Sequence, residues 1–281
     1  MGVPKSELAG GKNLDLTKKG LEVTDQPGSE AVESIVMAVD TSDEQRAIEL
    51  LNLATSSGAK RIKLGQELFS APGIGGVEGA LSLAGDLRAV IDAKTFDIGK
   101  TVLNTIKNLA SYAETFAITV PLISADEKGL RSVQEAAGDK TILGVTILSS
   151  VEEASCQRHY GKSRLDINRI LVEDALDYGV GGMVVSGEDT LKMIQEEYPE
   201  VSERGMVLMV PGIRSVWADL GGQSPENILT PAKAIALGAT WLVVGSPITN
   251  PTTNTDSRYQ DSKSSLMQIA TEIEQAQQKA A

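Results

Sequence analysis

Short apolar segments alternate with amphipathic segments from residue 34 to the end of the chain. The apolar segments carry Val, Ile, Leu and Met at consecutive positions, which is typical of parallel strands that are buried on both faces. The intervening segments, such as 42–56, 100–113 and 231–237, space apolar residues as amphipathic helices do. The eight predicted strands are residues 34–40, 60–64, 88–94, 115–120, 141–148, 182–186, 206–211 and 241–245.

Eight strand–helix units in one chain predict an α/β fold, a closed (β/α)8 TIM barrel, over residues 34–281. The alternative, an open Rossmann-like sheet, lacks a G-x-G-x-x-G motif after the first strand. A last helix is predicted at 264–280. We expect residues 1–33 to form a flexible or loosely docked N-terminal extension, and the polar segments 156–169 and 250–262 to form surface loops.

The composition excludes several classes of function. A net charge of −12 argues against a nucleic-acid partner but leaves a small anionic substrate possible. The single cysteine, Cys156, cannot form an internal disulfide and fits a reducing cytoplasm, and no apolar run predicts a membrane span or a signal peptide. His159, the only histidine, lies in a polar stretch, so Ser-His-Asp chemistry and histidine-based metal sites are not expected.

Charged residues break the apolar pattern at three predicted strand ends. Asp40 closes the first strand, Lys63 lies in the second, and Asp92 and Lys94 end the third with Asp97 just beyond. Residues two apart leave the same face of a strand, and the alternating charges of a Lys63–Asp92–Lys94–Asp97 array can be buried together. Because active sites of TIM barrels lie at the carboxyl ends of the strands, we interpret this charge array as catalytic; a structural salt-bridge network is the alternative.

Five segments resemble, in order and spacing, the motifs of the orotidine 5′-monophosphate (OMP) decarboxylase family. They are K-L-G-Q-E-L-F at 63–69, D-A-K-T-F-D-I at 92–98, V-T-I-L-S-S at 145–150, V-P-G-I-R at 210–214 and V-V-G-S-P-I-T at 243–249. The family motifs are K-x-G-x-E-x-F, D-x-K-x-x-D-I, V-T-x-L-[TS]-S, P-G-I-R and V-V-G-R-P-I-T. The resemblance covers about residues 34–275.

The resemblance implies a decarboxylase of pyrimidine biosynthesis that converts OMP to uridine 5′-monophosphate (UMP) without cofactor or metal. Loss of CO2 from C6 leaves a poorly delocalised carbanion, which must be stabilised electrostatically and protonated. By resemblance Lys94 is the proton donor, Asp92 lies near the departing carboxylate, and Lys63 and Asp97 hold the array in place.

The resemblance also implies the ligand contacts and the assembly. Asp40 would accept hydrogen bonds from the ribose hydroxyls, Ser149 would bond the pyrimidine, and Pro211 would line its apolar side. The phosphate would lie between Arg214 and the backbone N–H groups of Gly245 and Ser246. The residues that would cross to a partner's site, and so imply a homodimer with shared active sites, are Asp97, Ile98 and Thr101.

Three departures from the family pattern concern mostly the phosphate region. Ser246 stands where the family has an arginine, and Gln223 matches the family's D-Q-x-R pattern only after a short shift. Val120-Pro121 replaces the usual V-H of the fourth strand. Substitution by Arg214 or Arg258, weaker phosphate binding, and a changed substrate are all left open. Two further alternatives are a Mg2+-dependent sugar-phosphate decarboxylase or aldolase of the same superfamily and a nucleotide-binding barrel without activity.

Overall fold

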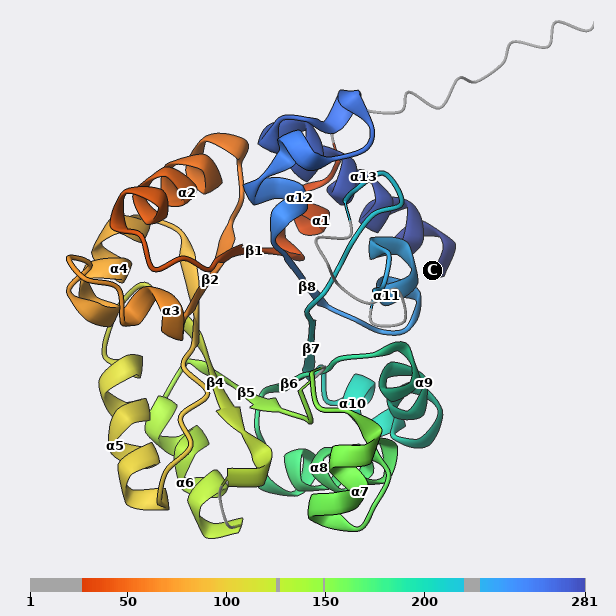
Figure 1. Cartoon of the computed structure of the whole chain (residues 1–281). Helices are drawn as coiled ribbons and strands as arrows, with labels where there is room; N and C mark the ends of the chain where they lie inside the picture. Colours follow the sequence, from red (N-terminus) through yellow and green to blue (C-terminus); the bar gives the residue numbers. More distant parts are fainter. Residues whose placement is uncertain (1–26, 125–126, 149, 220–227, 281) are drawn as a thin grey trace, which may run out of the picture.

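The computed structural model describes residues 27–124, 127–148, 150–219 and 228–280, and these form a closed eight-stranded barrel (Figure 1). All strands are parallel, each pairs with the next along the chain, and β8 pairs with β1. The strands are β1 Ile35–Val39, β2 Arg61–Gly65, β3 Arg88–Asp92, β4 Thr115–Pro121, β5 Thr141–Val145, β6 Gly182–Val184, β7 Val207–Val210 and β8 Trp241–Val244. The predicted TIM barrel is confirmed, with most strands one to three residues shorter than expected.

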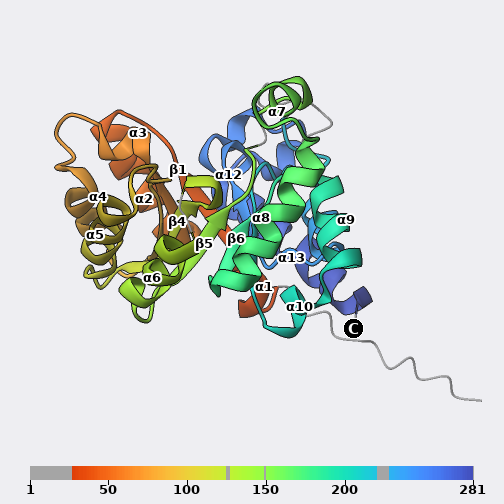
Figure 2. The ribbon, with the colours of Figure 1, turned by 90° about the horizontal axis from the view of Figure 1, so that it is seen from below.

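Helices surround the barrel on its outer face (Figures 1 and 2). They are α1 Ser29–Glu33, α2 Glu44–Ser57, α3 Gln66–Phe69, α4 Gly76–Ala84, α5 Gly99–Ala110, α6 Glu127–Ala137, α7 Glu153–Tyr160, α8 Arg164–Tyr178, α9 Glu188–Glu197, α10 Pro199–Glu203, α11 Pro231–Ala236, α12 Ser246–Thr249 and α13 Ser262–Ala280. The predicted helices at 42–56, 100–113, 231–237 and 264–280 correspond to α2, α5, α11 and α13. Within the described ranges, no helix has both the length and the apolarity needed to cross a membrane.

The prediction of a surface loop at 156–169 is wrong, because this segment forms most of α7 and the start of α8. Ser163 caps α8 by accepting a hydrogen bond from the Asp166 N–H, and Cys156 and Ile167 are buried. The many polar residues of the segment occupy the outer faces of the two helices, which hid the helical pattern. Segment 250–262 is irregular, as expected, with short 3-10 turns at Pro251–Thr253 and Ser257–Tyr259.

The sequence places residues 29–33 in the N-terminal extension, but they form helix α1, ahead of the predicted boundary at residue 34. Ala31 is buried, α1 packs against α13, and the Gly28 N–H donates a hydrogen bond to Glu274 of that helix. Figure 2 shows α1 at the opposite end of the barrel from α3 and α7. The rest of the predicted extension, residues 1–26, lies outside the described residues.

An arginine closes the amino-terminal end of the barrel. Arg61, the first residue of β2, is 7% exposed, and its guanidinium lies 5.3 Å from the ring centroid of Phe116 and 5.2 Å from that of Trp241. Glu33 pairs with it at 3.3 Å. Trp241 is therefore a packing residue, and this filled end leaves the carboxyl ends of the strands for ligand entry.

We expect Arg61→Ala to lower the free energy of unfolding by about 2–3 kcal/mol, because it removes two cation–π contacts and the packing of a buried alkyl chain. Arg88→Ala is the matched control. Arg88 also faces Phe116 and Glu33, but its side chain is 56% exposed, so its loss should cost less than about 1 kcal/mol. Urea denaturation measures both; equal effects would contradict the role given to Arg61.

Candidate active site

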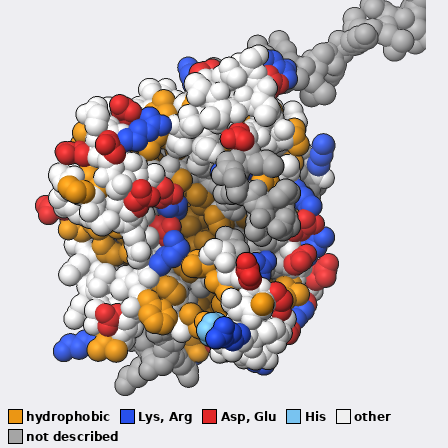
Figure 3. Space-filling model, viewed as in Figure 1, with side chains coloured by type: hydrophobic (Ala, Val, Ile, Leu, Met, Phe, Trp, Pro, Cys, Tyr) orange, Lys and Arg blue, Asp and Glu red, His pale blue; other side chains and the backbone are white. Residues whose placement is uncertain are grey.

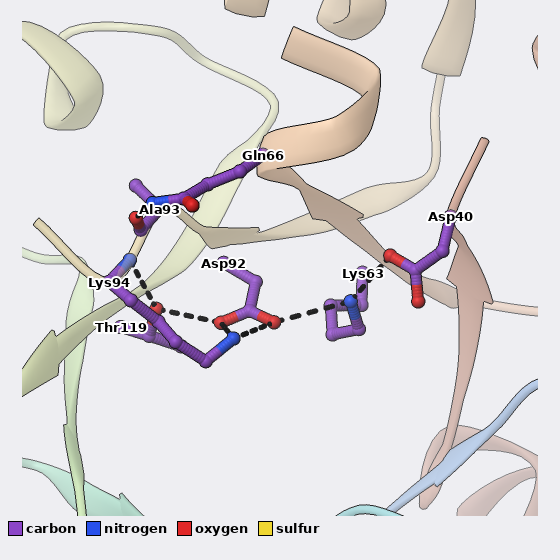
Figure 4. Close-up of polar contacts among 7 residues, drawn as sticks. All are labelled: Asp40, Lys63, Gln66, Asp92, Ala93, Lys94 and Thr119. Carbon is purple, nitrogen blue, oxygen red and sulfur yellow. Dashed lines mark hydrogen bonds and ion pairs between the residues drawn. The ribbon is translucent and has the colours of Figure 1, made fainter. Parts of the chain in front are cut away.

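Four charged side chains meet at the carboxyl end of three adjacent strands (Figure 4). Asp40 follows β1, Lys63 lies in β2, and Asp92 ends β3. Lys63 Nζ lies 2.8 Å from Asp40 Oδ1 and 3.2 Å from Asp92 Oδ2. Lys94 Nζ lies 2.7 Å from both Asp92 oxygens. Within one chain the charges thus run Asp40–Lys63–Asp92–Lys94, and Asp40 pairs with Lys63 at the opposite end from the position beyond Lys94 that the sequence predicts for Asp97.

An unusual backbone conformation brings Lys94 onto Asp92. Strand β3 ends at Asp92, and Lys94 has a φ of 45°, the only positive φ outside glycine among the described residues. Left-handed backbone is costly for a residue with a long side chain and is found where surrounding structure enforces it. Here it ends the strand and folds the ammonium of Lys94 back onto the carboxylate two residues earlier.

The contacts within the array keep Asp92 and Lys63 charged. Burial disfavours the ionised Asp92 carboxylate, but attraction to Lys63 and Lys94 outweighs it and holds the pKa of Asp92 below its ordinary value. Burial likewise disfavours the ammonium of Lys63, yet Asp92 and Asp40 raise its pKa above the ordinary value. Asp92 therefore remains an anion between two cations at neutral pH.

Gly65 and Gln66, which follow Lys63 in the chain, help to shape the array. A methyl group at Gly65 would lie 2.8 Å from Asp40 Oδ1 and 3.4 Å from Lys63 Nζ, so a larger residue would displace the Asp40–Lys63 pair. The Gln66 amide donates to the carbonyl oxygen of Ala93, which ties the end of β2 to the turn that carries Lys94. These two contacts explain the glycine and the glutamine of the segment K-L-G-Q-E-L-F at 63–69.

Sequence reasoning did not single out Thr119, on β4. Its side chain is fully buried and its hydroxyl hydrogen-bonds both the Asp92 carboxylate and the Lys94 backbone. Threonine is common in strands because of its β propensity, so its presence in the sequence gives no sign of a functional role. Only the position of Thr119 beside the end of β3 reveals the contact.

The array faces a cavity of about 190 Å³ at the mouth of the barrel. Pro211, predicted to contact the base, lies in its wall, as do two hydroxyl residues that the sequence did not single out, Thr146 and Ser186. Figure 3 shows the hollow, lined by hydrophobic side chains, with charged side chains at its edge. A mostly apolar pocket with a few convergent polar groups is typical of a small-molecule site.

Two residues predicted to bind phosphate have unpaired polar atoms. Arg214, after β7, is 7% exposed, and its Nη1 donates to the Ile213 carbonyl, while its Nε finds no hydrogen-bond partner within the described part of the chain. The buried hydroxyl of Ser246, which follows Gly245 after β8, also has no partner there. Buried polar groups are normally paired, so these two atoms are exceptions among the described residues. The predicted contacts Ser149 and Gln223 lie outside the described residues.

The loop that carries Arg214 is anchored to α13. The Glu272 carboxylate accepts hydrogen bonds from Ser215 Oγ at 2.8 Å and Trp217 Nε1 at 2.7 Å. The Trp217 carbonyl accepts from both the N–H and the hydroxyl of Thr255, and its ring contacts Tyr259. Trp217 is thus a packing residue, and it joins the loops that follow β7 and β8.

The structure does not bring Asp97, Ile98 or Thr101 to the array of the same chain. All three are exposed at the start of α5, and Asp97 Oδ1 accepts a hydrogen bond from the Ile98 N–H at 2.6 Å. Ile98 and Phe96 are each 72% exposed. Two large exposed apolar side chains on either side of an exposed carboxylate are typical of a contact surface.

Comparison with known proteins identifies the family. The model of the orotidine 5′-phosphate decarboxylase / HUMPS family matches residues 33–256. An orotidine 5′-phosphate decarboxylase of Rhodopseudomonas palustris (strain BisA53) is 34% identical over 78% of this chain and 89% of its own length. The enzyme of Afipia carboxidovorans is 32% identical over 86% of this chain and 94% of its own length. The chain belongs to the orotidine 5′-phosphate decarboxylase / HUMPS family.

Solved structures with this family's name share the fold. The orotidine 5′-phosphate decarboxylase of Lactobacillus acidophilus superposes with a TM-score of 0.67 at 22% identity, covering 89% of this chain and 99% of that chain. The enzyme of Methanocaldococcus jannaschii, complexed with the inhibitor BMP, gives 0.61 at 19% identity over 85% and 98% of the two chains. Arg258, one of the two arginines considered as a substitute phosphate ligand in the sequence, is exposed and paired with Asp256 at 2.7 Å.

Proposed function

We propose that this chain catalyses the decarboxylation of OMP to UMP without a cofactor. The observation that carries the proposal is the Lys94 ammonium, held 2.7 Å from both oxygens of Asp92 in the wall of the apolar cavity. An ammonium beside a permanent anion, in a site that excludes water, can stabilise a carbanion and also protonate it.

The reaction uses the two ends of this ion pair differently. Asp92, ionised because of its lowered pKa, lies against the carboxylate of the bound substrate. Repulsion between the two carboxylates raises the free energy of the bound substrate. The C6–carboxylate bond breaks, CO2 leaves, and the electron pair stays on C6, where Lys94 stabilises it. Lys94 then gives a proton to C6 and recovers one from solvent. Lys63, a cation with a raised pKa, keeps Asp92 in place.

Substrate contacts are assigned to the residues around this centre. Asp40 binds the ribose hydroxyls, Ser149 bonds the base, and Pro211 lines its apolar side. The phosphate is bound by Arg214, Gln223 and the backbone N–H groups of Gly245 and Ser246. The assignment is supported by Arg214 Nε and Ser246 Oγ, which have no hydrogen-bond partner within the described residues and can each donate to an anion.

The proposal includes a cytoplasmic homodimer with shared active sites. Asp97, Ile98 and Thr101 have no contact with the array of their own chain, and they sit on an exposed apolar segment. In a symmetric dimer such a segment can reach the partner's site, and Asp97 then adds a fifth charge to the four that meet there.

The geometry disfavours the Mg2+-dependent alternative. The Lys63 ammonium lies between the carboxylates of Asp40 and Asp92, at 2.8 Å and 3.2 Å. A divalent cation that used these two carboxylates would have to displace it, and like charges at this distance repel.

The test is to identify the products formed from OMP and from the sugar phosphate 3-keto-L-gulonate 6-phosphate by NMR, each with EDTA and with Mg2+. We expect UMP from OMP at the same rate in both conditions and no change in the sugar phosphate. Metal-dependent loss of CO2 from the sugar phosphate, with OMP unchanged, would overturn the proposal. If neither compound reacts, yet UMP binds, the chain is a nucleotide-binding barrel.

A further inference from the structure

We propose that Thr119 is a positioning residue that fixes the catalytic ion pair, an inference that rests on the proposed function. Thr119 lies on β4, one residue after Ile118, which pairs with Ile91 of β3. Its side chain therefore stands beside Asp92, and it is 0% exposed. Figure 4 shows Thr119 against both Asp92 and Lys94.

The hydroxyl makes two different hydrogen bonds. Thr119 Oγ1 lies 2.9 Å from Asp92 Oδ1 and 3.2 Å from the backbone nitrogen of Lys94. An ionised carboxylate can only accept and a backbone N–H can only donate. The hydroxyl proton therefore points to Asp92, and an oxygen lone pair receives the Lys94 N–H. No other orientation satisfies both partners.

These two bonds act on the two parts of the ion pair that must not move. The first fixes the rotation of the Asp92 carboxylate, whose oxygens also receive Lys94 Nζ and Lys63 Nζ. The second holds the N–H of the one described non-glycine residue in left-handed backbone. Without the hydroxyl this N–H loses its side-chain acceptor, and the turn that aims Lys94 loses a restraint.

Thr119 does not need to touch the substrate to matter. Catalysis depends on charges held where the transition state requires them, and small misplacements of such groups are costly in rate. The effect should thus fall on kcat rather than on KM, because binding of the ribose and phosphate uses other residues.

The experiment compares Thr119→Val, Thr119→Ser and Thr115→Val. Valine keeps the β-branched shape of threonine without the hydroxyl, whereas serine keeps the hydroxyl. Thr115 begins the same strand and is equally buried, but its hydroxyl has no partner within the described residues. We expect Thr119→Val to lower kcat about 10- to 100-fold with KM changed less than about threefold. Thr119→Ser should recover most of the rate, and Thr115→Val should match the wild type.

A second measurement does not depend on turnover. Hydrogen exchange of the Lys94 amide, followed by NMR, should be at least about tenfold faster in Thr119→Val than in the wild type and in Thr119→Ser. Unchanged exchange, or equal kcat for Thr119→Val and Thr115→Val, would overturn the positioning role. If the wild type does not decarboxylate OMP while exchange still responds, the proposed function fails but the positioning of Lys94 by Thr119 stands.

Discussion

An equimolar mixture of the Lys94→Ala and Asp97→Ala proteins, each inactive alone, should regain about a quarter of the wild-type activity. Lys94→Ala removes both the proton donor and the cation beside the carbanion, so its rate should fall about 10⁴-fold or more. Asp97→Ala removes the charge that this residue contributes to the array of the partner subunit, and the rate should fall by at least about 100-fold.

The recovery follows from shared sites. In a mixed dimer one site lacks both side chains, whereas the other draws an intact Lys94 from one subunit and an intact Asp97 from its partner. Random exchange makes about half of the dimers mixed, and each mixed dimer has one complete site of two, which gives the quarter. Mass spectrometry under native conditions verifies the mixed dimers. If they form and the mixture remains inactive, Asp97 does not act across the interface.

Arg214→Ala should raise the KM for OMP about 30- to 100-fold, because the phosphate would lose its only charged side-chain contact in the proposal. Ser246 supplies a hydroxyl but no charge, so Arg214 bears more of the binding here than where an arginine follows the strand-8 glycine. Part of the effect should appear in kcat, since phosphate binding can be used to stabilise the transition state.

Arg258→Ala is the control for Arg214. Arg258 lies in the loop after β8, but its guanidinium pairs with Asp256 and stacks on Tyr259. Its removal should change KM less than about threefold. Steady-state kinetics on OMP decide between the two arginines, and a large effect of Arg258→Ala with none of Arg214→Ala would reverse their roles.

The barrel could be predicted because its strands are buried on both faces and read as apolar runs. The charge array could be predicted because Asp40, Lys63, Asp92 and Lys94 interrupt those runs at one end of the barrel. Helices α7 and α8 could not be predicted, because the segment 156–169 has more exposed polar residues than buried residues such as Cys156.

Other features depend on contacts between strands that the sequence does not reveal. Asp97 does not join the array of its own chain. This depends on the left-handed turn at Lys94 and on the exposed position of Asp97 at the start of α5. The role of Thr119 depends on the register between β3 and β4, which is irregular between Ala89 and Val90. Neither the turn nor the register can be inferred from the residue types alone.

The central claim is that the Lys94 ammonium, held by Asp92, carries out the decarboxylation of OMP. The most direct test is the initial rate of absorbance loss as purified wild-type protein and Lys94→Ala convert OMP, with UMP binding measured on both to verify the site. The account predicts rapid loss with the wild type, a rate lower by about 10⁴-fold or more with the variant, and UMP binding by both. Turnover by Lys94→Ala near the wild-type rate would contradict it.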